Sequence, residues 1–338
     1  MSAYREMKID KSLYQRRGGF FRALEEMDPS ADYRGTDLGQ LTAFERQLKR
    51  FDIHVSGSAS DPVEKFFRTA NSAVLFPEYI ARSVRQGMEE GDLLPSITAA
   101  TTRFEGMDYR SITAQAGGDS KELKAVDEGA SIPATTIQVQ ANLVKLRKRG
   151  RMLVASYEAV RYQKLDLFSV TLRQIGSHIA QMLLADAVDV LIHGDGNDNA
   201  AAASETKGAG VLTYDELVDF WAAFDPYEMN TLLVSSDVLL KMLKLAEFQN
   251  PLTGLNFQGT GKLATPLGAT LLRTSVLPKN TAIGLDKRYA LELVQGSDVM
   301  VEYDKLIDRQ LERAAITTIS GFAKLFQGAS RVLTVKAS

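Results

Sequence analysis

The sequence predicts an α+β fold whose longest elements extend further than one compact domain requires. Three observations support this prediction: helical periodicity through 165–193, apolar residues that alternate within 98–155, and β-branched and aromatic stretches after 299. Elements of this length cannot bury all of their apolar surface within one chain. We therefore expect a subunit that assembles with copies of itself.

The composition is that of a folded protein without disulfide bonds. Hydrophobic residues make up 45% of the 338 residues and charged residues 24%, and a chain of this length can bury a sizeable core without cross-links. The chain has no cysteine, which excludes disulfides, thiolate nucleophiles and cysteine-ligated zinc.

The charge balance argues against tight DNA binding. The chain has 40 basic and 42 acidic residues and a net charge of −2, whereas many phosphate contacts need a basic excess or a basic face. The N-terminal sequence is too polar for a signal peptide. No apolar run approaches the roughly 18 residues that a membrane span requires, so we expect no membrane partner.

Residues 1–70 are polar and are interrupted by glycine, proline and small residues. One amphipathic helix is predicted there from the spacing of Leu41, Phe44, Leu48 and Phe51. Arg46, Lys49 and Arg50 fall on its other side. The segment has few apolar residues for a core of its own, which indicates an arm that docks on something else.

The next distinctive region is a long β-hairpin, predicted from about Thr98 to Ser156. Its apolar residues occupy odd-numbered positions up to Leu143 and even-numbered positions from Val144 onward. This change indicates a bulge or a change of covering face at Val144. The two sets are Ile137, Val139, Ala141 and Leu143, then Val144, Leu146, Met152 and Val154. A hairpin of this length is marginally stable unless it packs against something, and a neighbouring subunit is an obvious candidate.

The strongest helix prediction follows at about 165–193. One apolar stripe runs along it, formed by Leu165, Phe168, Leu172, Ile175, Ile179 and Met182. Asp166 is the expected N-cap, and the glycine-rich sequence at 193–197 ends the helix. Such a helix would extend on the order of 40 Å.

Residues 211–295 are predicted to form a mixed α/β unit, and the remainder to form strands. The expected elements are helices at Tyr214–Phe224 and Asp237–Phe248, a strand at Thr231–Ser235, a polar loop from Pro251 to about Thr265, and strands at Val299–Tyr303, Ala314–Phe326 and Arg331–Lys336.

The sequence contains no recognisable catalytic or metal-binding constellation. His54, His178 and His193 have no metal-ligand spacing. GTGK at 259–262 does not complete a phosphate loop. The run from Asp195 begins like a calcium loop, but its sixth and twelfth positions are Ala200 and Thr206. We therefore expect a protein that is not an enzyme and has no cofactor.

A basic tract lies on the descending side of the predicted hairpin, formed by Lys145, Arg147, Lys148, Arg149 and Arg151. In a strand, four of these side chains would share one face, namely Lys145, Arg147, Arg149 and Arg151. The face could be solvated, contact DNA, or contact another subunit. Asp127 and Glu128, or Glu89 and Glu90, are acidic partners for an intersubunit contact. DNA contact is the least favoured of the three, because no aromatic residues are interleaved with the charges.

The order of these parts resembles the major capsid proteins of tailed bacteriophages, with the Hong Kong 97-like fold. The resemblance covers the chain from about Ala70 onward. It is based on FPEYI at 76–80, FEGMDYRSI at 104–112, DEGASIP at 127–133, LIHGDGND at 191–198, PLGATLLRTSVLP at 266–278 and ISGFAKLFQGASRVLTVK at 319–336.

The resemblance implies a division of the chain into named parts. These are an N-terminal arm at 1–70, the start of a peripheral domain at 71–97, an extended hairpin loop at 98–155, the peripheral domain with its spine helix at 156–210, an axial domain at 211–296 and the peripheral sheet at 297–338. The basic tract would then contact a neighbouring subunit. Some members cross-link a hairpin lysine to a C-terminal asparagine, but no asparagine follows Asn280, so we expect no such bond.

The implied function is a shell that assembles from pentamers and hexamers in the host cytoplasm and encloses double-stranded DNA without sequence-specific binding. Portal, scaffold and cement proteins are the implied partners. An encapsulin, which has the same fold and encloses cargo enzymes, is the alternative. A soluble enzyme with an unrecognised site is a third hypothesis, and it would form a small oligomer with ligand-dependent stability.

Overall fold

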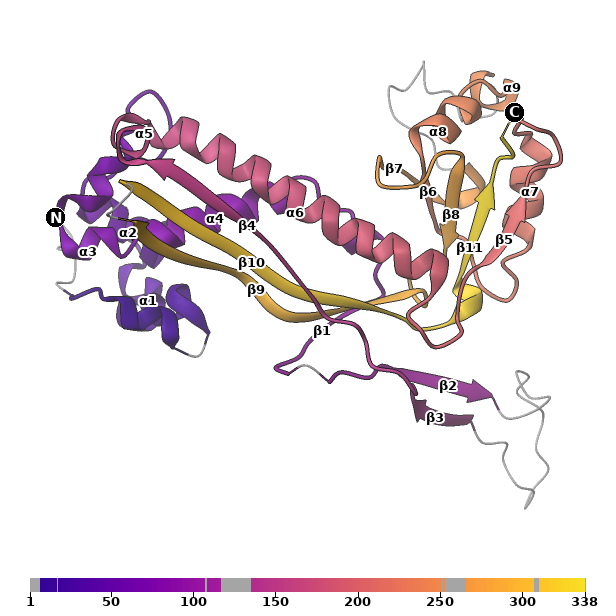
Figure 1. Cartoon of the computed structure of the whole chain (residues 1–338), viewed down its shortest axis with the longest axis horizontal. Helices are drawn as coiled ribbons and strands as arrows, with labels where there is room; N and C mark the ends of the chain where they lie inside the picture. The colour runs from indigo at the N-terminus through magenta and orange to yellow at the C-terminus, as the bar shows by residue number, and fades with distance from the viewer. Residues whose placement is uncertain are drawn as a thin grey trace. The chain divides into compact units, whose positions relative to one another are not determined.

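The computed structural model describes residues 7–16, 18–106, 108–116, 135–250, 252, 266–306 and 310–337 (Figure 1). The chain divides into two compact units. The first comprises Met1–Asp92, Arg149–Ala180 and Asp298–Thr318, and the second comprises Leu93–Lys148, Gln181–Ser297 and Ile319–Ser338.

Helices and strands both contribute substantially, as the predicted α+β class requires. The helices are η1 (Lys11–Gln15), α1 (Gly19–Met27), η2 (Ser30–Tyr33), α2 (Ala43–Arg50), η3 (Val63–Arg68), α3 (Ala70–Ala73), α4 (Phe76–Glu89), η4 (Leu94–Ser96), α5 (Tyr157–Tyr162), α6 (Leu165–His193), α7 (Tyr214–Ala222), α8 (Ser236–Met242), α9 (Ala246–Gln249), η6 (Pro266–Gly268) and η8 (Gln327–Ala329). The strands are β1 (Ala100–Arg103), β2 (Ile112–Ala116), β3 (Thr135–Val139), β4 (Arg147–Ser156), β5 (Ala202–Glu205), β6 (Thr231–Val234), β7 (Thr270–Arg273), β8 (Thr281–Leu285), β9 (Leu291–Leu306), β10 (Leu311–Lys324) and β11 (Ser330–Thr334).

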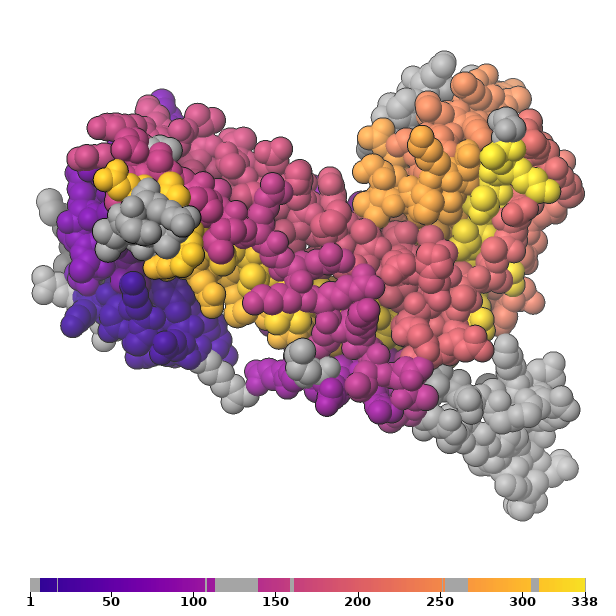
Figure 2. Space-filling model, viewed as in Figure 1, coloured from indigo at the N-terminus to yellow at the C-terminus, as the bar shows by residue number. Residues whose placement is uncertain are grey.

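The N-terminal segment is a packed helical body, and the expectation that it has little core of its own is wrong. Helix α2 begins with a capping box, in which Thr42 accepts from the Glu45 amide and the Glu45 carboxylate accepts from the Thr42 amide. Apolar side chains from η1, α1, α2 and their connections are buried, among them Ile9, Leu13, Phe20, Leu24, Leu38, Phe44 and Leu48. The first residues of the segment, coloured indigo, gather in one place at the lower left of Figure 2.

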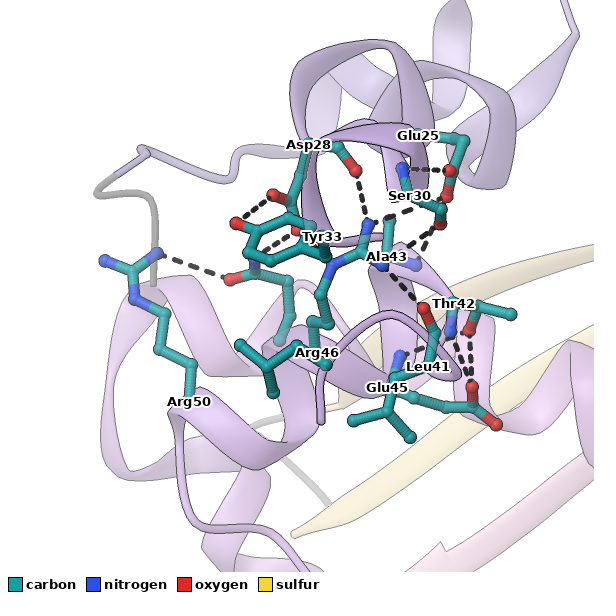
Figure 3. A network of polar contacts seen from close by, with 12 residues as sticks. Glu25, Asp28, Ser30, Tyr33, Leu41, Thr42, Ala43, Glu45, Arg46 and Arg50 are labelled. Atoms are coloured by element: carbon teal, nitrogen blue, oxygen red, sulfur yellow. Dashed lines mark hydrogen bonds and ion pairs between the residues drawn. The ribbon is translucent and has the colours of Figure 1, made fainter. Parts of the chain in front are cut away.

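Arg46, which falls on the side of α2 opposite the predicted apolar stripe, is fully buried beside Asp28 (Figure 3). Its Nε lies 2.9 Å from the Asp28 carboxylate, and its Nη1 donates to the Ser30 hydroxyl at 3.0 Å and to the Leu41 carbonyl at 2.5 Å. The guanidinium also lies over the Tyr33 ring, 4.5 Å from its centroid. A single helix period could not indicate this contact, because Asp28 comes from the end of α1.

Helices α4 and α6 approach closely within the first unit at two glycines. A Cβ on Gly87 would lie 2.0 Å from the Arg173 carbonyl oxygen, and a Cβ on Gly176 would lie 2.0 Å from the Val84 carbonyl oxygen. Both positions therefore require the absence of a side chain. Phe66, Phe76 and Tyr79 pack together at the start of α4.

The long helix α6 has the predicted bounds, but two details differ. Asp166 is its second residue rather than its N-cap, and the first amides bond to the preceding segment, Leu165 N–H to the Asp61 carbonyl and Asp166 N–H to the Ser60 hydroxyl. Met182 is 47% exposed, and Leu183 is buried in its place. At the other end, Gly194 adopts φ +82° and terminates the helix.

By length and composition, α6 could cross a membrane, which the inspection of apolar runs did not anticipate. Its best 18-residue window has a mean hydropathy of 1.4, and 56% of that window is buried inside the structure. Burial of this kind is also found in the core helix of a soluble protein.

The predicted long hairpin is shorter than expected. Strands β2 and β3 pair antiparallel, with Ile112 opposite Val139. Strands β1 and β4 instead belong to a four-stranded sheet of order β1-β9-β10-β4. The change of apolar parity at Val144 falls in the segment between β3 and β4, so it reflects two different strands rather than a bulge within one.

The second unit contains a five-stranded sheet of order β5-β11-β8-β6-β7. Helix α7 begins with a capping box formed by Thr213 and Glu216, and its Leu217 and Phe220 pack on the sheet core. Strands β5 and β11 lie outside the predicted axial segment at 211–296, but they pair within the same sheet as β6, β7 and β8. The single helix predicted at Asp237–Phe248 is two, α8 and α9. Most of the predicted polar loop lies outside the described residues.

Candidate intersubunit interface

The hairpin formed by β2 and β3 displays apolar side chains to solvent. Ile112 and Val139 face each other across the two strands and are 58% and 62% exposed. Leu143, just beyond β3, is also exposed. A two-stranded ribbon is marginally stable alone, and a directly opposed apolar pair at its base is a surface that gains from being covered.

The ascending side of the hairpin is fastened to β9 by one buried carboxylate. Glu292 accepts hydrogen bonds from the hydroxyls of Thr102 at 2.6 Å, Tyr109 at 2.6 Å and Ser111 at 2.5 Å. Desolvation and the Glu292 carboxylate raise the pKa of Tyr109. Three donors satisfy a buried carboxylate without a cation, so this anchor holds its residues in one geometry.

A small apolar cluster lies under the same base. Val144, Val294 and Ala323 are buried together, and Phe104, Tyr109 and Leu146 pack against them. The Val144 amide donates to the Tyr109 carbonyl at 2.8 Å, which joins the two sides of the hairpin where they leave the sheet.

The descending side is fastened to the loop after α6. The Asn142 amide donates to the Asn197 side chain at 2.9 Å, and the Asn142 side chain donates to the Gly196 carbonyl at 2.5 Å. Asn197 also donates to the Gln140 side chain at 3.1 Å. We call Gln140, Asn142, Asp195, Asn197, Asn199 and Lys324 the polar junction.

Within the polar junction, Asp195 acts as a structural acceptor. One of its carboxylate oxygens accepts from the Asn197 amide and side chain, at 3.2 and 2.9 Å, and the other accepts from the Lys324 amide at 2.8 Å. The carboxylate of Asp195 therefore has a structural role in the run that begins like a calcium loop. In the part of the chain that the structure describes, no group of three histidine or acidic side chains is arranged to hold a metal ion.

The predicted basic row is divided between different environments. Arg147 pairs within the chain, with Nη1 2.5 Å from the Asp186 carboxylate and Nη2 3.5 Å from that of Asp189. Arg149 is half-buried, whereas Lys145 and Arg151 are exposed. Asp127 and Glu128 lie outside the described residues. An intersubunit role for this row stays a prediction, and Arg147 already has partners on α6.

Sequence reasoning did not identify the Ile112–Val139 pair, the Glu292 anchor or the polar junction. The alternation of Val139 with polar neighbours was a signal for a strand, but not for which face would remain uncovered. Glu292 and Lys324 gave no signal, because their partners are far away in the sequence and isolated polar residues are common.

The chain has relatives among known proteins. A family model described as phage capsid protein matches residues 140–324. No curated protein matches. The capsid of a native GTA particle is similar in structure, with 17% identity, a TM-score of 0.54 and coverage of 72% of this chain and 90% of that one.

Two phage proteins are similar to the same degree. A chain from Gordonia phage Cozz has 14% identity and a TM-score of 0.52, and the match covers 73% of this chain and 87% of that chain. The capsid of the cyanophage P-SCSP1u has 12% identity and a TM-score of 0.52, with coverage of 71% and 86%. At these identities, the likeness establishes the fold.

Proposed function

The chain belongs to the phage capsid protein family and is a capsid shell subunit with the Hong Kong 97-like fold, and from this premise we propose that it assembles into pentamers and hexamers of an icosahedral shell. Membership of a capsid family implies a structural role rather than a catalytic one. The family model also favours the phage capsid over the encapsulin alternative.

The exposed pair Ile112–Val139 is the observation that carries the proposal. Each side chain is more than half exposed, so burying both in a neighbour would contribute about 1–2 kcal/mol apiece. Contacts of this strength are weak singly. A subunit held at several such sites in a closed ring gains avidity, and the anchors at the hairpin base limit the entropy lost on docking.

The domain division remains part of the proposal. The hairpin would reach a neighbouring subunit, and the segment 211–296 would form the axial domain, enlarged by β5 and β11. The segments 71–97, 156–201 and 297–329 would form the peripheral domain. The packed segment at 1–70 would act as the N-terminal arm by contacting a neighbouring subunit with its outer surface, because its own apolar side chains are already buried.

The shell would enclose double-stranded DNA without sequence-specific contacts. A net charge of −2 supports this proposal, because tight phosphate binding would oppose the movement of DNA into and out of the shell. Assembly would occur in the host cytoplasm, with portal, scaffold or cement proteins as partners and with no cofactor.

Assembly of a hairpin variant tests the proposal. Wild-type protein, expressed alone or with the adjacent capsid genes, should give closed shells or capsomer rings by electron microscopy. The double variant Ile112→Asp/Val139→Asp should remain unassembled, because two carboxylates would be desolvated at the contact. Its melting temperature should change little, since both positions are exposed in the subunit.

The matched control is Ile112→Val/Val139→Ile, which keeps the pair apolar and should assemble like the wild type. Normal shells from the aspartate variant would exclude this pair from the interface. A wild-type protein that stays monomeric even with the adjacent genes would overturn the assembly proposal itself. Purified shells with a cargo enzyme and no DNA would favour the encapsulin alternative.

A further inference from the structure

Lys324 is the last residue of β10 and is completely buried, with 0% of its surface exposed. Lysine is rarely buried to this extent, because its stem usually carries the ammonium to water. Here Nζ donates to the Leu191 carbonyl oxygen at 3.2 Å, in the last turn of α6. Among the residues that the structure describes, Leu191 provides the one acceptor for this group.

The backbone of Lys324 is the centre of the polar junction. Its amide donates to Asp195 at 2.8 Å, and its carbonyl accepts from Gln140 at 3.1 Å and from Asn199 at 3.4 Å. The position of this one residue therefore determines how the hairpin side, through Gln140, meets the loop after α6. A change in the charge on Lys324 acts on all of these contacts.

The groups that surround the ammonium favour its neutral form. Burial lowers the pKa of Lys324 to about 8, and the Asp195 carboxylate opposes that shift. The Leu191 carbonyl, which accepts from the ammonium, is uncharged. The adjoining backbone is held by Gln140 from the hairpin base, which donates to the Lys324 carbonyl, and by the Ala290 carbonyl, which accepts from the Leu325 amide at 3.1 Å. An ammonium has three donors and a charge, whereas a neutral amine has two donors and no charge, so the single Leu191 carbonyl leaves less of the neutral form unsatisfied.

We propose that Lys324 is a proton-controlled latch that holds the base of the hairpin more firmly when it is neutral than when it is charged. Opening of the polar junction admits water to Lys324 and restores its ordinary proton affinity. Between the closed-state pKa of about 8 and the ordinary lysine pKa of 10.5, the open state therefore binds a proton that the closed state lacks. Raising the pH through this range favours the closed state. Below this range Lys324 is charged in both states, and the free-energy cost of burying the charge in the closed state no longer changes with pH.

Hydrogen exchange at the hairpin base tests the latch without reference to assembly, so its result is independent of the proposed function. The amides of Gln140, Asn142 and Val144 all donate hydrogen bonds there. After correction for intrinsic exchange, their opening equilibrium in the wild type should fall about eightfold between pH 7.5 and 9.0. Peptides from the N-terminal helices serve as an internal reference.

Three variants make the test specific. Lys324→Met keeps the apolar stem without the charge and should show protection that does not vary over this pH range. Lys324→Arg stays charged throughout and should be the least protected, again without pH dependence. Asn142→Ala weakens the polar junction and should lower protection at both pH values while keeping the eightfold response.

The proposal is overturned by an unchanged opening equilibrium in the wild type, or by the same pH response in Lys324→Met. If that variant does not fold, the Asn142→Ala response decides the question, because it retains Lys324. A loss of the response in Asn142→Ala would also contradict the latch.

Discussion

At the scale of single residues, the most consequential side chain of the first unit is Arg46. Its charge is removed from water and is compensated by Asp28, which also accepts from the Tyr33 hydroxyl at 2.7 Å (Figure 3). A buried ion pair contributes little net stability when it is compared with apolar residues, but breaking it leaves one charge unpaired in the interior.

We expect Arg46→Met to lower the free energy of unfolding by about 3–5 kcal/mol, since the Asp28 carboxylate would lose its cation. Urea denaturation of the purified protein measures this change. The double variant Arg46→Met/Asp28→Leu should recover a large part of the loss. Arg22→Ala is the control, because Arg22 pairs with Glu26 at the surface and should cost less than about 1 kcal/mol. A small effect of Arg46→Met would show that water reaches Asp28.

At the scale of elements, the long helix was the best predicted part of the fold, and the error in its apolar stripe has a geometric cause. The chosen apolar residues follow spacings of three and four that average 3.4 residues per turn, whereas an α-helix has 3.6. The apolar stripe therefore drifts around the helix as it lengthens. By the fifth turn, Leu183 has moved onto the buried face and Met182 off it.

Strand positions were predicted better than strand partners. The segments near β6, β10 and β11 were recognised from their apolar and β-branched residues, which report burial. Pairing depends on contacts between distant segments, and no local pattern indicates that β11 joins β5 and β8. For the same reason the sequence indicated that a hairpin exists, but not that β4 leaves it to join β10.

The contact between α4 and α6 gives a prediction at this scale. Gly176→Ala should destabilise the protein by roughly 1–3 kcal/mol, because the added methyl group must force the helices apart. Thermal denaturation measures the effect. Gly91→Ala is the matched control, since its nearest neighbour would be the Ser177 hydroxyl at 3.8 Å, an ordinary contact. Equal stability of the two variants would mean that the helices separate at little cost.

At the scale of the whole molecule, we propose that assembly depends on charged contacts as well as on apolar ones. Lys145 and Arg151 are the exposed members of the basic row, and Asp127 and Glu128 are their proposed partners in a neighbour. Such pairs contribute more to orientation and to the rate of encounter than to affinity. Arg147 is less suited to this role, because it is already paired with Asp186.

We expect Arg151→Glu to slow shell formation, followed by light scattering, by about tenfold or more at low salt, since a like charge would face the acidic pair. Adding Asp127→Lys/Glu128→Lys should restore the rate, and 0.5 M salt should reduce the difference between the variants. Lys148→Glu, on the opposite face of β4, serves as the control. A defect that the charge swap leaves uncorrected would remove these residues from the interface.

The place of β11 within its sheet affects how a newly made chain acquires its structure. Arg331 pairs with Ala202 in β5 and with Gly284 in β8, so the sheet cannot be completed until translation has passed these late residues. The helices of the N-terminal segment pack locally and can form much earlier. Until β11 is made, β5 and β8 have unpaired edges that can associate with other nascent chains. A ribosome that pauses before this strand would therefore hold a partly folded subunit in its most aggregation-prone form, while other copies are being synthesised nearby.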